Sequence, residues 1–412
     1  MRYRTLEKLF HADRTSDRFS NAEKAYRERL TSESSFRTGI QLKTGELFLA
    51  VPRELSLSSE QLLRRERRVS ALWKSLPVVA LHAYISSLIL DEVVSSNEIE
   101  GVRSTRQEIE LALENIQRDT AGLQGAAEKE HAPFAEFAQL YLGLTGDPKP
   151  PSTLRDIRDI FEAVAKDAIE KNDVPHDSLF RTGPVIIEGG RGRIRHEGAA
   201  PREIAPLLQQ WLSLSQSDEI PEIFSAILCH FLFGYIHPFY DGNGRTGRYL
   251  LALHLSKPLS EPTVLSLSRT IAENKNAYYK AFDEVERPLN HAEATPFLLT
   301  MLDLMGQAQE RLIADLEDKK MLIEHLRAAI DVPELDLSKR SQAALFYACQ
   351  MELVGGFNEV NQSDMATWLD VSTPTARSTL RDLESHGLML QTSSRPPKFR
   401  LTEKAKSLMG SR

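Results

Sequence analysis

The chain has 412 residues, and its shares of hydrophobic (41%) and charged (26%) residues are ordinary for a globular protein. A chain of this length is expected to hold two or three domains, each with an ample core. The formal net charge of −7 argues against binding of nucleic acid by the chain as a whole, although it leaves room for a local basic face.

Three further features bear on where the protein works. Cys229 and Cys349 are the only cysteines, so neither a disulfide framework nor a cysteine-based metal site is expected. Residues 1–30 are charged throughout and lack the apolar segment of a signal peptide. Residues 223–239, the most apolar stretch, are interrupted by histidines and fall short of the roughly 18 apolar residues that a membrane span needs. We therefore expect a cytoplasmic protein without a membrane partner.

Helical periodicity dominates the sequence. Apolar residues recur at three- and four-residue spacing over residues 57–94 and 107–118, and Thr105 followed by Glu108 has the spacing of a capping box. A proline-rich break follows at residues 146–151. We expect a mainly α fold with four parts, which are an N-terminal helical region (1–145), a core domain (146–305), a connector helix (306–340) and a C-terminal domain (341–412).

The predicted core domain contains one hairpin among its helices. Residues 179–196 form an apolar strand, a glycine-rich turn and a returning strand. Residues 202–214 and 276–287 have the pattern of core helices, and residues 223–236 are apolar at helical spacing.

The most informative segment is the run His237-Pro238-Phe239-Tyr240-Asp241-Gly242-Asn243-Gly244-Arg245-Thr246-Gly247-Arg248. His237 can take a proton from a hydroxyl near neutral pH, and Asp241 offers the single carboxylate by which Mg²⁺ is usually held. Residues 242–244 can adopt positive φ and point their N–H groups into one concavity, which suits an anion.

The run lies between two apolar helical segments, so it is predicted to be the loop between two buried helices. The second helix is expected to begin near Asn243, which would place its unsatisfied N–H groups and positive dipole end against the same anion. Arg245 and Arg248 are three residues apart and share a face of that helix, from which both can reach one polyphosphate.

The sequence pattern changes after residue 305. Residues 306–330 form a charged amphipathic helix, and residues 364–388 have the rhythm of helix, turn and helix, with a start at Thr373 and Pro374 and a cap at Gly387. Residues 389–402 then supply two short strands.

This C-terminal unit, residues 341–412, resembles a winged helix. From Val371 onward it carries 8 basic and 3 acidic residues, a local charge of +5. Such a unit can bind DNA through its second helix, or it can serve as a protein-interaction or homodimer module, and the sequence leaves these uses open.

The run at residues 237–248 matches, without a departure, the signature His-x-Phe-x-(Asp/Glu)-Gly-Asn-Gly-Arg-x-x-Arg of the Fic family. The resemblance implies transfer of AMP from ATP to a Ser, Thr or Tyr hydroxyl of a protein, self-modification included. It makes His237 the catalytic base and Asp241 the ligand of Mg²⁺. The ATP-binding residues that it implies are Glu100, Gly242, Asn243, Gly244, Arg245, Thr246, Gly247, Arg248 and Asn274.

A second match to the family lies upstream. Ser96-Asn97-Glu98-Ile99-Glu100-Gly101 fits the inhibitory pattern (Ser/Thr)-x-x-x-Glu-(Gly/Asn). The resemblance implies that Ser96, Glu100 and Gly101 belong to an inhibitory helix, and that Glu100 pairs with Arg248 and occupies the γ-phosphate position. Arginine and carboxylate form strong bidentate pairs, so this inhibition is chemically reasonable.

Other functions stay open. The predicted hairpin resembles the family's flap, which positions targets by β-pairing. Some Fic relatives transfer UMP, phosphate or phosphocholine, and some use the inhibitory glutamate to remove AMP from a target. A DNA-binding regulator whose Fic core senses nucleotide is the other class, but the presence of both His237 and Asp241 favours a transferase.

Overall fold

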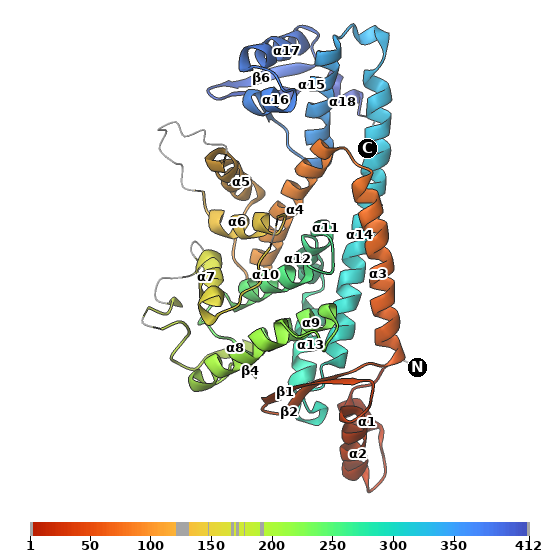
Figure 1. Ribbon diagram of the computed structural model, residues 1–412, viewed down its shortest axis with the longest axis vertical. Helices are drawn as coiled ribbons and strands as arrows, with labels where there is room; N and C mark the ends of the chain where they lie inside the picture. Colours follow the sequence, from red (N-terminus) through yellow and green to blue (C-terminus); the bar gives the residue numbers. More distant parts are fainter. Residues whose placement is uncertain are drawn as a thin grey trace. The chain divides into compact units, whose positions relative to one another are not determined.

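The computed structural model describes residues 3–120, 132–146, 148–165, 169, 173–176, 178–189 and 193–409. The fold is mainly helical with three small sheets, in agreement with the predicted class (Figure 1). Three predicted features fall partly outside the described residues: Asp147 in the break, residues 190–192 in the hairpin turn, and Arg412 in the basic segment.

The chain divides into two compact units. The larger comprises Met1–Glu66 and Ile89–Gln309, and the smaller comprises Arg67–Leu88 and Glu310–Arg412. Three helices contribute residues to both units, namely α3 (Arg53–Lys74), α4 (Val78–Ile99) and α14 (Thr295–Ile330).

The larger unit begins with elements that the sequence patterns did not predict. Helices α1 (Leu6–Ala12) and α2 (Arg18–Leu30) precede the antiparallel strands β1 (Ser35–Leu42) and β2 (Gly45–Ala50). Strand β2 is buried from its second residue onward, so it lacks the alternation of polar and apolar residues that marks a half-buried strand.

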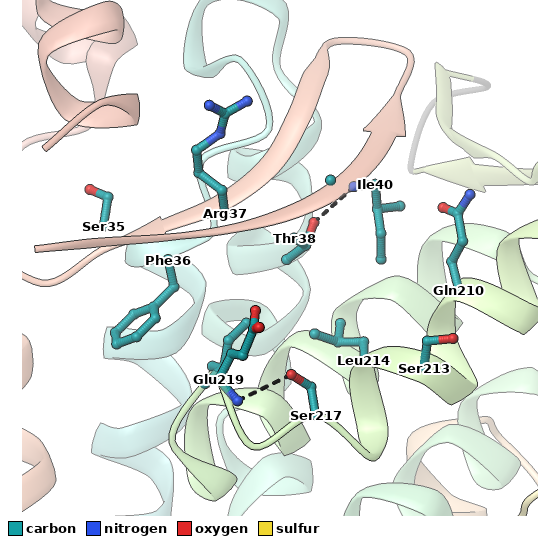
Figure 2. A pocket seen from close by; sticks show the side chains of 12 residues that line it. Ser35, Phe36, Arg37, Thr38, Ile40, Gln210, Ser213, Leu214, Ser217 and Glu219 are labelled. Carbon is teal, nitrogen blue, oxygen red and sulfur yellow. Dashed lines mark hydrogen bonds between the residues drawn. The ribbon is translucent and has the colours of Figure 1, made fainter. Parts of the chain in front are cut away.

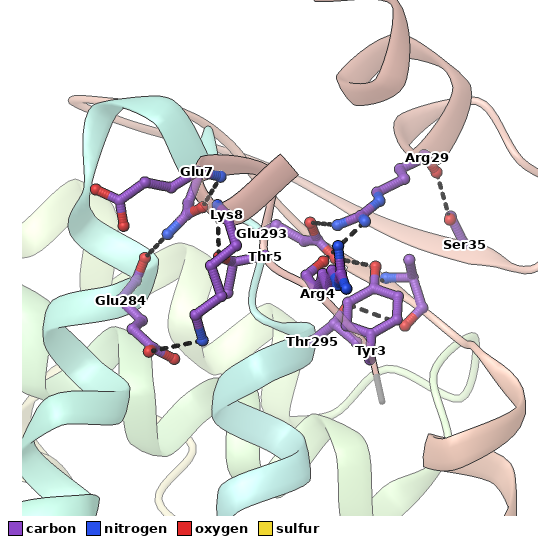
Figure 3. Close-up of polar contacts among 12 residues, drawn as sticks. Tyr3, Arg4, Thr5, Glu7, Lys8, Arg29, Ser35, Glu284, Glu293 and Thr295 are labelled. Atoms are coloured by element: carbon purple, nitrogen blue, oxygen red, sulfur yellow. Dashed lines mark hydrogen bonds and ion pairs between the residues drawn. The ribbon is translucent and has the colours of Figure 1, made fainter. Parts of the chain in front are cut away.

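Ion pairs and hydrogen bonds connect these N-terminal helices to a later part of the same unit (Figure 3). Arg29 pairs with the buried Glu293 at 2.6 Å, and Lys8 lies 3.7 Å from Glu284. The backbone N of Glu7 donates to Asn290 Oδ1 at 2.8 Å. The start of the chain is therefore fixed against residues 284–293.

Helix α9 (Glu222–Ile236) is central to this unit. It is apolar around its whole circumference, as expected of a helix buried on all sides. It packs against α8 (Pro201–Ser215) and α10 (Asn243–Leu255). Trp211 of α8 donates from Nε1 to the carbonyl of Cys229 at 2.7 Å, and Phe231 packs against Phe282 and Phe297.

The remaining helices surround this centre. The predicted capping box is present, because Glu108 N donates to Thr105 Oγ1 at 3.3 Å and Thr105 N donates to Glu108 Oε2 at 2.8 Å.

Strands β3 (Ile186–Gly189) and β4 (Arg193–Glu197) pair antiparallel within the predicted hairpin. The other helices are α5 (Arg106–Thr120), α6 (Ala135–Gly143), α7 (Leu154–Ala165), α11 (Glu261–Val264), α12 (Leu267–Glu273) and α13 (Lys275–Glu286).

Helix α14 differs from its prediction. The charged pattern predicted a helix over residues 306–330, whereas α14 begins at Thr295. Its first turns are buried in the core through Phe297, Leu298 and Met301, so they lack the polar face by which the later turns were recognised.

Helix α4 is long and apolar enough to cross a membrane by length and composition alone. From the sequence, residues 223–239 were identified as the most apolar stretch and were predicted to be too short for a membrane span. More than half of its apolar window, 56%, is buried inside the protein. Glu92, Ser96 and Asn97 are among its buried residues. These properties are those of a core helix.

The smaller unit combines helices with a three-stranded sheet of order β5-β7-β6. Its α17 begins at Thr373 and is capped by Ser372, and Gly387 just after it has a φ of +67°, as predicted for a helix cap. The elements are α15 (Lys339–Gln350), β5 (Val360–Asn361), α16 (Gln362–Trp368), α17 (Thr373–Ser385), β6 (Met389–Ser394), β7 (Pro397–Leu401) and α18 (Glu403–Ser407).

Candidate functional site

The predicted base lies at the point where α9 ends. His237 is the residue after the last helical position, and its backbone is left-handed, with φ +50° and ψ +62°. Its neighbour Phe239 is fully buried and stacks on Phe161 with ring centroids 3.6 Å apart. The buried ring fixes the loop that starts at His237.

Asn243 closes this loop at its other end. Its side-chain Oδ1 accepts from Phe239 N at 2.9 Å, and its Nδ2 donates to Phe239 O at 2.8 Å. Gly242 has a φ of +79°, and a Cβ there would lie 2.5 Å from Ile169 Cδ1. Helix α10 starts at Asn243 as predicted, so its free N–H groups begin inside the loop.

Arg245 is the residue in the loop whose charged group lacks hydrogen-bond partners among the described residues. Its side chain is fully buried, yet Nε and both terminal nitrogens lack a hydrogen-bond partner within the described part of the chain. The nearest carboxylate oxygen, on Asp241, lies 3.8 Å away. A buried guanidinium without acceptors is costly unless a ligand supplies them. This is the arrangement of an anion site.

Arg248 is also buried, but its guanidinium is fully engaged by the end of α4. Nε donates to Ser96 Oγ at 3.0 Å, one terminal nitrogen donates to Ser96 O at 2.8 Å, and the other donates to Glu100 Oε1 at 2.7 Å. The predicted ion pair between Glu100 and Arg248 is therefore present.

The backbone at the end of α4 explains why Ser96 O is free to accept. Gly101 is left-handed, and the N–H groups of Gly101 and Val102 donate to the carbonyls of Glu98 and Asn97, both at 3.0 Å. This is a Schellman cap, in which Glu100 takes the last position before the glycine. The Glu-Gly pair of the inhibitory pattern is thus a helix end whose glycine sets the direction of Glu100.

The Glu100 carboxylate lies directly over the start of α10. A Cβ added to Gly244 would lie 2.0 Å from Glu100 Oε1, so only glycine leaves room for the carboxylate. Burial acts to raise the pKa of Glu100, but Arg248, together with Arg245 and Lys275, outweighs it, and the pKa lies below its ordinary value. An ionised carboxylate therefore occupies the anion-binding end of the helix.

Glu92 shares the face of α4 that carries Ser96 and Glu100, since the three are spaced four residues apart. It is buried and accepts hydrogen bonds from Ser268 N at 2.9 Å, from the Ser268 hydroxyl and from Tyr141 OH at 3.3 Å. Burial raises the pKa of Glu92 to about 7. This contact anchors α4 beside the site.

His237 is in the protonation state that a base requires. Burial, followed by the neighbouring His196, lowers the pKa of His237 to about 4. The His196 ring is 6.0 Å away and is itself held by Glu286 at 2.7 Å and by the carbonyl of Tyr235 at 2.9 Å. At neutral pH His237 is uncharged and can accept a proton.

The other predicted site residues have more ordinary surroundings. Thr246 is buried, and Gly247 packs against Phe233 while its carbonyl lies 3.0 Å from His230 Nδ1. Asn274 donates to Thr270 O at 3.0 Å and to Gln307 Oε1 at 3.3 Å, at the junction of α12 and α13. The motif and the end of α4 are thus brought together, whereas Asn274 is bonded to Thr270 of α12 and to Gln307 of α14.

Sequence reasoning missed three residues around the loop. Arg181 is buried and donates to carbonyls near His237, and Tyr240 OH accepts from Gly183 N at 2.9 Å. Lys275 Nζ donates to the carbonyl of Ile99, another free acceptor at the end of α4. None of these residues stands in a pattern that a single sequence makes visible.

The site is distinct from the cavity between β1 and α8 (Figure 2). That cavity has a volume of about 570 Å³ and is lined by residues such as Arg37, Gln210 and Glu219. None of the predicted site residues lines it.

Comparison with known proteins gives consistent results. Residues 151–255 match the Fic/DOC family. A protein adenylyltransferase Fic from Drosophila mojavensis is 26% identical over 284 residues, which are 65% of this chain and 49% of that protein. One from Drosophila grimshawi is 25% identical over 296 residues, covering 68% of this chain and 53% of that protein. The chain spans about half the length of these curated relatives.

A solved structure shares the fold. A Fic family protein from Desulfovibrio desulfuricans G20 superposes with a TM-score of 0.52 at 19% identity, over 88% of this chain and 98% of that chain. Residues 151–255, which hold His237 and the glycine loop, thus match the Fic/DOC family, and the chain around them is similar to proteins named protein adenylyltransferase.

Proposed function

We propose that the protein transfers AMP from ATP to the hydroxyl of a Ser, Thr or Tyr side chain of a protein, with release of pyrophosphate. The observation that carries the proposal is the buried guanidinium of Arg245 at the start of α10, for which the described residues supply no hydrogen-bond acceptor. A polyphosphate supplies such acceptors, and the free N–H groups at the start of the helix add to its binding.

The chemistry then needs a base and little covalent help. His237 is neutral because burial keeps its pKa near 4. Its unprotonated ring nitrogen therefore takes the proton of the incoming hydroxyl. The hydroxyl oxygen attacks the α-phosphorus, and the bond to the pyrophosphate oxygen breaks. Transfer of this type depends mainly on positioning and on neutralising the phosphate charge, which the arginines and the loop amides provide.

Mg²⁺ fits the residues present. Asp241 has a half-exposed carboxylate, and within the described residues no cluster of three or more His, Cys, Asp or Glu side chains could hold a metal. One carboxylate with phosphate oxygens and water is the usual coordination of Mg²⁺ at nucleotides. Asp241 would hold the ion, which would neutralise charge on the phosphates when bound.

We further propose that Glu100 inhibits this reaction in cis. Its carboxylate pairs with Arg248 at 2.7 Å and lies against Gly244, so it takes up both an arginine and space that a γ-phosphate needs. Removing the carboxylate leaves Arg248 still bonded to Ser96 by two hydrogen bonds and ready for a phosphate.

Parallel incubations with ATP labelled at the α- or the γ-phosphorus, in the presence of Mg²⁺, test both proposals. Glu100→Gly should raise self-modification by the α-label roughly 10- to 100-fold, because a charge-assisted hydrogen bond of about 1.5–3 kcal/mol no longer opposes ATP. Glu98→Gly, at an exposed position on the same turn of α4, is the matched control and should leave the wild-type level unchanged.

The labels separate the alternatives. Incorporation of the γ-label alone would indicate phosphate transfer, and incorporation of neither label by the Glu100→Gly protein would contradict the transferase. Faster loss of AMP from labelled protein with wild type than with Glu100→Gly would indicate removal of AMP by Glu100.

A second candidate function is DNA binding by the smaller unit. We propose that this unit is a winged helix, because α16 and α17 are followed by the paired strands β6 and β7, and Arg377 and Arg381 are exposed one turn apart on α17. The exposed Arg395 and Arg400 lie in the β6–β7 hairpin segment. These guanidinium groups suit the phosphates of a duplex.

A further inference from the structure

Arg181 is a buried arginine that is bonded to backbone alone. Its residue is only 2% exposed, and its guanidinium donates to four backbone carbonyls. The acceptors are His237 O at 2.7 Å, Gly183 O at 2.7 Å, Ala199 O at 2.6 Å and Ile236 O at 3.3 Å. These four bonds use four of the five N–H donors of the guanidinium, so it offers little capacity for a ligand.

The four acceptors belong to three separate segments that meet at this guanidinium. Gly183 leads into β3, Ala199 follows β4, and Ile236 with His237 forms the end of α9. Backbone hydrogen bonds join the same segments, from Arg181 N to Pro238 O at 3.0 Å and from Ala199 N to Ile236 O at 3.1 Å. The guanidinium therefore connects both ends of the β3–β4 hairpin with the turn that carries the base.

The packing around the Arg181 guanidinium leaves no space for a side chain at position 198. A Cβ on Gly198 would lie 2.6 Å from a terminal nitrogen of Arg181 and 3.1 Å from His237 Cβ. Gly198 is thus a second residue required by the same arrangement.

The turn at His237 needs support of this kind. A left-handed conformation at a residue other than glycine costs about 1–3 kcal/mol and persists only where its surroundings fix it. The carbonyls of Ile236 and His237 lie at the end of α9, where a helix leaves its last carbonyls without partners. Arg181 satisfies both carbonyls with one side chain.

We infer that Arg181 is a positioning residue, which holds His237 in its left-handed conformation and fixes the base relative to both ends of the hairpin. The inference rests on the proposed function, in which His237 is the base. Arg181 does not touch the reacting atoms; it acts through the backbone of His237.

Arg158 provides a matched control. It is buried to a similar degree, 6% exposed, and also donates to carbonyls, at Pro175 O (2.7 Å), Leu179 O (3.1 Å) and Ser178 O (3.2 Å), while its Nε pairs with Glu162 at 2.8 Å. These three carbonyls belong to the loop that precedes Arg181 in the sequence, and none of them lies in the turn at His237. A loss of general stability should therefore appear in Arg158→Met and Arg181→Met alike, whereas a loss of positioning should appear only in the second.

Kinetics of AMP transfer in the Glu100→Gly background form the first arm of the test. Arg181→Met should lower kcat about 100-fold, the effect of a displacement on the order of 1 Å at a catalytic group, with the KM for ATP unchanged. Arg181→Lys keeps donors and charge and should retain most of kcat. Added guanidinium should partly restore Arg181→Met and have no effect on Arg158→Met.

The second arm needs no transfer activity. Histidine NMR titration of the full chain follows His237, whose signal is assigned by its loss in His237→Ala. The charged or titratable groups that act on it are His196, Arg181 and Glu100. Because the Arg181 charge helps to lower the pKa of His237, Arg181→Met should raise it, and Arg181→Lys and Arg158→Met should not.

The outcomes distinguish a failure of the positioning role of Arg181 from a failure of the proposed function. Equal kcat losses in Arg181→Met and Arg158→Met, with the His237 titration unmoved, would overturn the positioning role. A shifted titration without AMP transfer by any variant would leave the positioning of His237 supported and remove the proposed function instead.

Discussion

At His237 the helix ends, the backbone turns left-handed and burial removes the charge of the ring at neutral pH. These three properties follow from one location, the end of a helix that is buried on all sides. Arg245, eight residues later, differs from His237, because its buried permanent charge has no hydrogen-bond acceptor among the described residues. In the reaction that we propose, the neutral base would act at the hydroxyl and the cation at the phosphates.

Replacing His237 by alanine should lower AMP transfer by about 100- to 10,000-fold, which is the usual contribution of a general base. ATP binding, measured by calorimetry, should stay within a factor of two or so, because the base acts on the incoming hydroxyl. His176→Ala, an exposed histidine in the same unit, is the control. A His237→Ala protein that transferred AMP at the parent rate would exclude this residue as the base.

At the scale of the element, α4 is both a core helix and the cover of the site. One face of its C-terminal end carries Glu92, Ser96 and Glu100; Glu92 is bonded to Ser268, and Ser96 and Glu100 are both bonded to Arg248. The cap at Gly101 ends the helix at the point where Glu100 reaches Arg248. The inhibition that we propose would depend on where this helix ends as much as on the identity of the acid.

Glu92→Gln should make stability less dependent on pH. Burial raises the pKa of Glu92 from 4.5 to about 7, so between these values the folded chain binds a proton that the unfolded chain has lost. Stability therefore falls as pH rises through this window, by on the order of 2–3 kcal/mol. The glutamine side chain of the variant carries no charge, so the variant does not lose this stability as the pH rises.

Thermal and denaturant unfolding at pH 5 and pH 8 measure this effect. The Glu92→Gln protein should be the more stable one at pH 8 and should match the wild type at pH 5. Glu98→Gln, an exposed change on the same helix, should show no such difference. An equal change in stability at both pH values would mean that Glu92 does not titrate in this window.

Sequence patterns were sufficient for some elements and not for others, for physical reasons. The loop at residues 237–248 and the start of α10 at Asn243 were predictable because glycines, a cap and an apolar flank agree. Strand β2 and the first turns of α14 were missed because full burial removes the periodicity that marks an element. Arg181 was missed because its partners are backbone carbonyls, three of them far away in the chain, which leave no trace in side-chain identity.

At the scale of the whole molecule, the smaller unit draws on distant parts of the chain. Its core packs Leu345, Leu380 and Phe399 together with Val79 from α4 and Leu326 from α14. A fragment that begins at residue 341 would lack those last two contributions. Binding experiments on this unit are therefore best made with the full chain.

If the smaller unit binds DNA, the double variant Arg377→Ala with Arg381→Ala should weaken binding, because both side chains are exposed on α17. The slope of log affinity against log salt should shrink by roughly one for each arginine that no longer neutralises a phosphate. Gel-shift with genomic fragments at several salt concentrations measures both. Arg202→Ala, an exposed arginine on α8, is the control, and wild-type binding no tighter than the double variant's would favour a protein-interaction or dimer module.

The paired hydrogen bonds between Asn243 and the backbone of Phe239 also bear on how the protein ages. Asn243 precedes Gly244, and in unstructured peptides an Asn-Gly pair readily deamidates, since the glycine nitrogen can attack the side-chain amide carbon. Here both amide atoms are engaged and Asn243 lies in the first turn of α10, so the geometry of that attack is unavailable while the loop stays closed. Conversion to aspartate would put a second negative charge inside this loop, beside Asp241, and remove the donor to Phe239 O. The chemical lifetime of the site is therefore set by how often this loop opens.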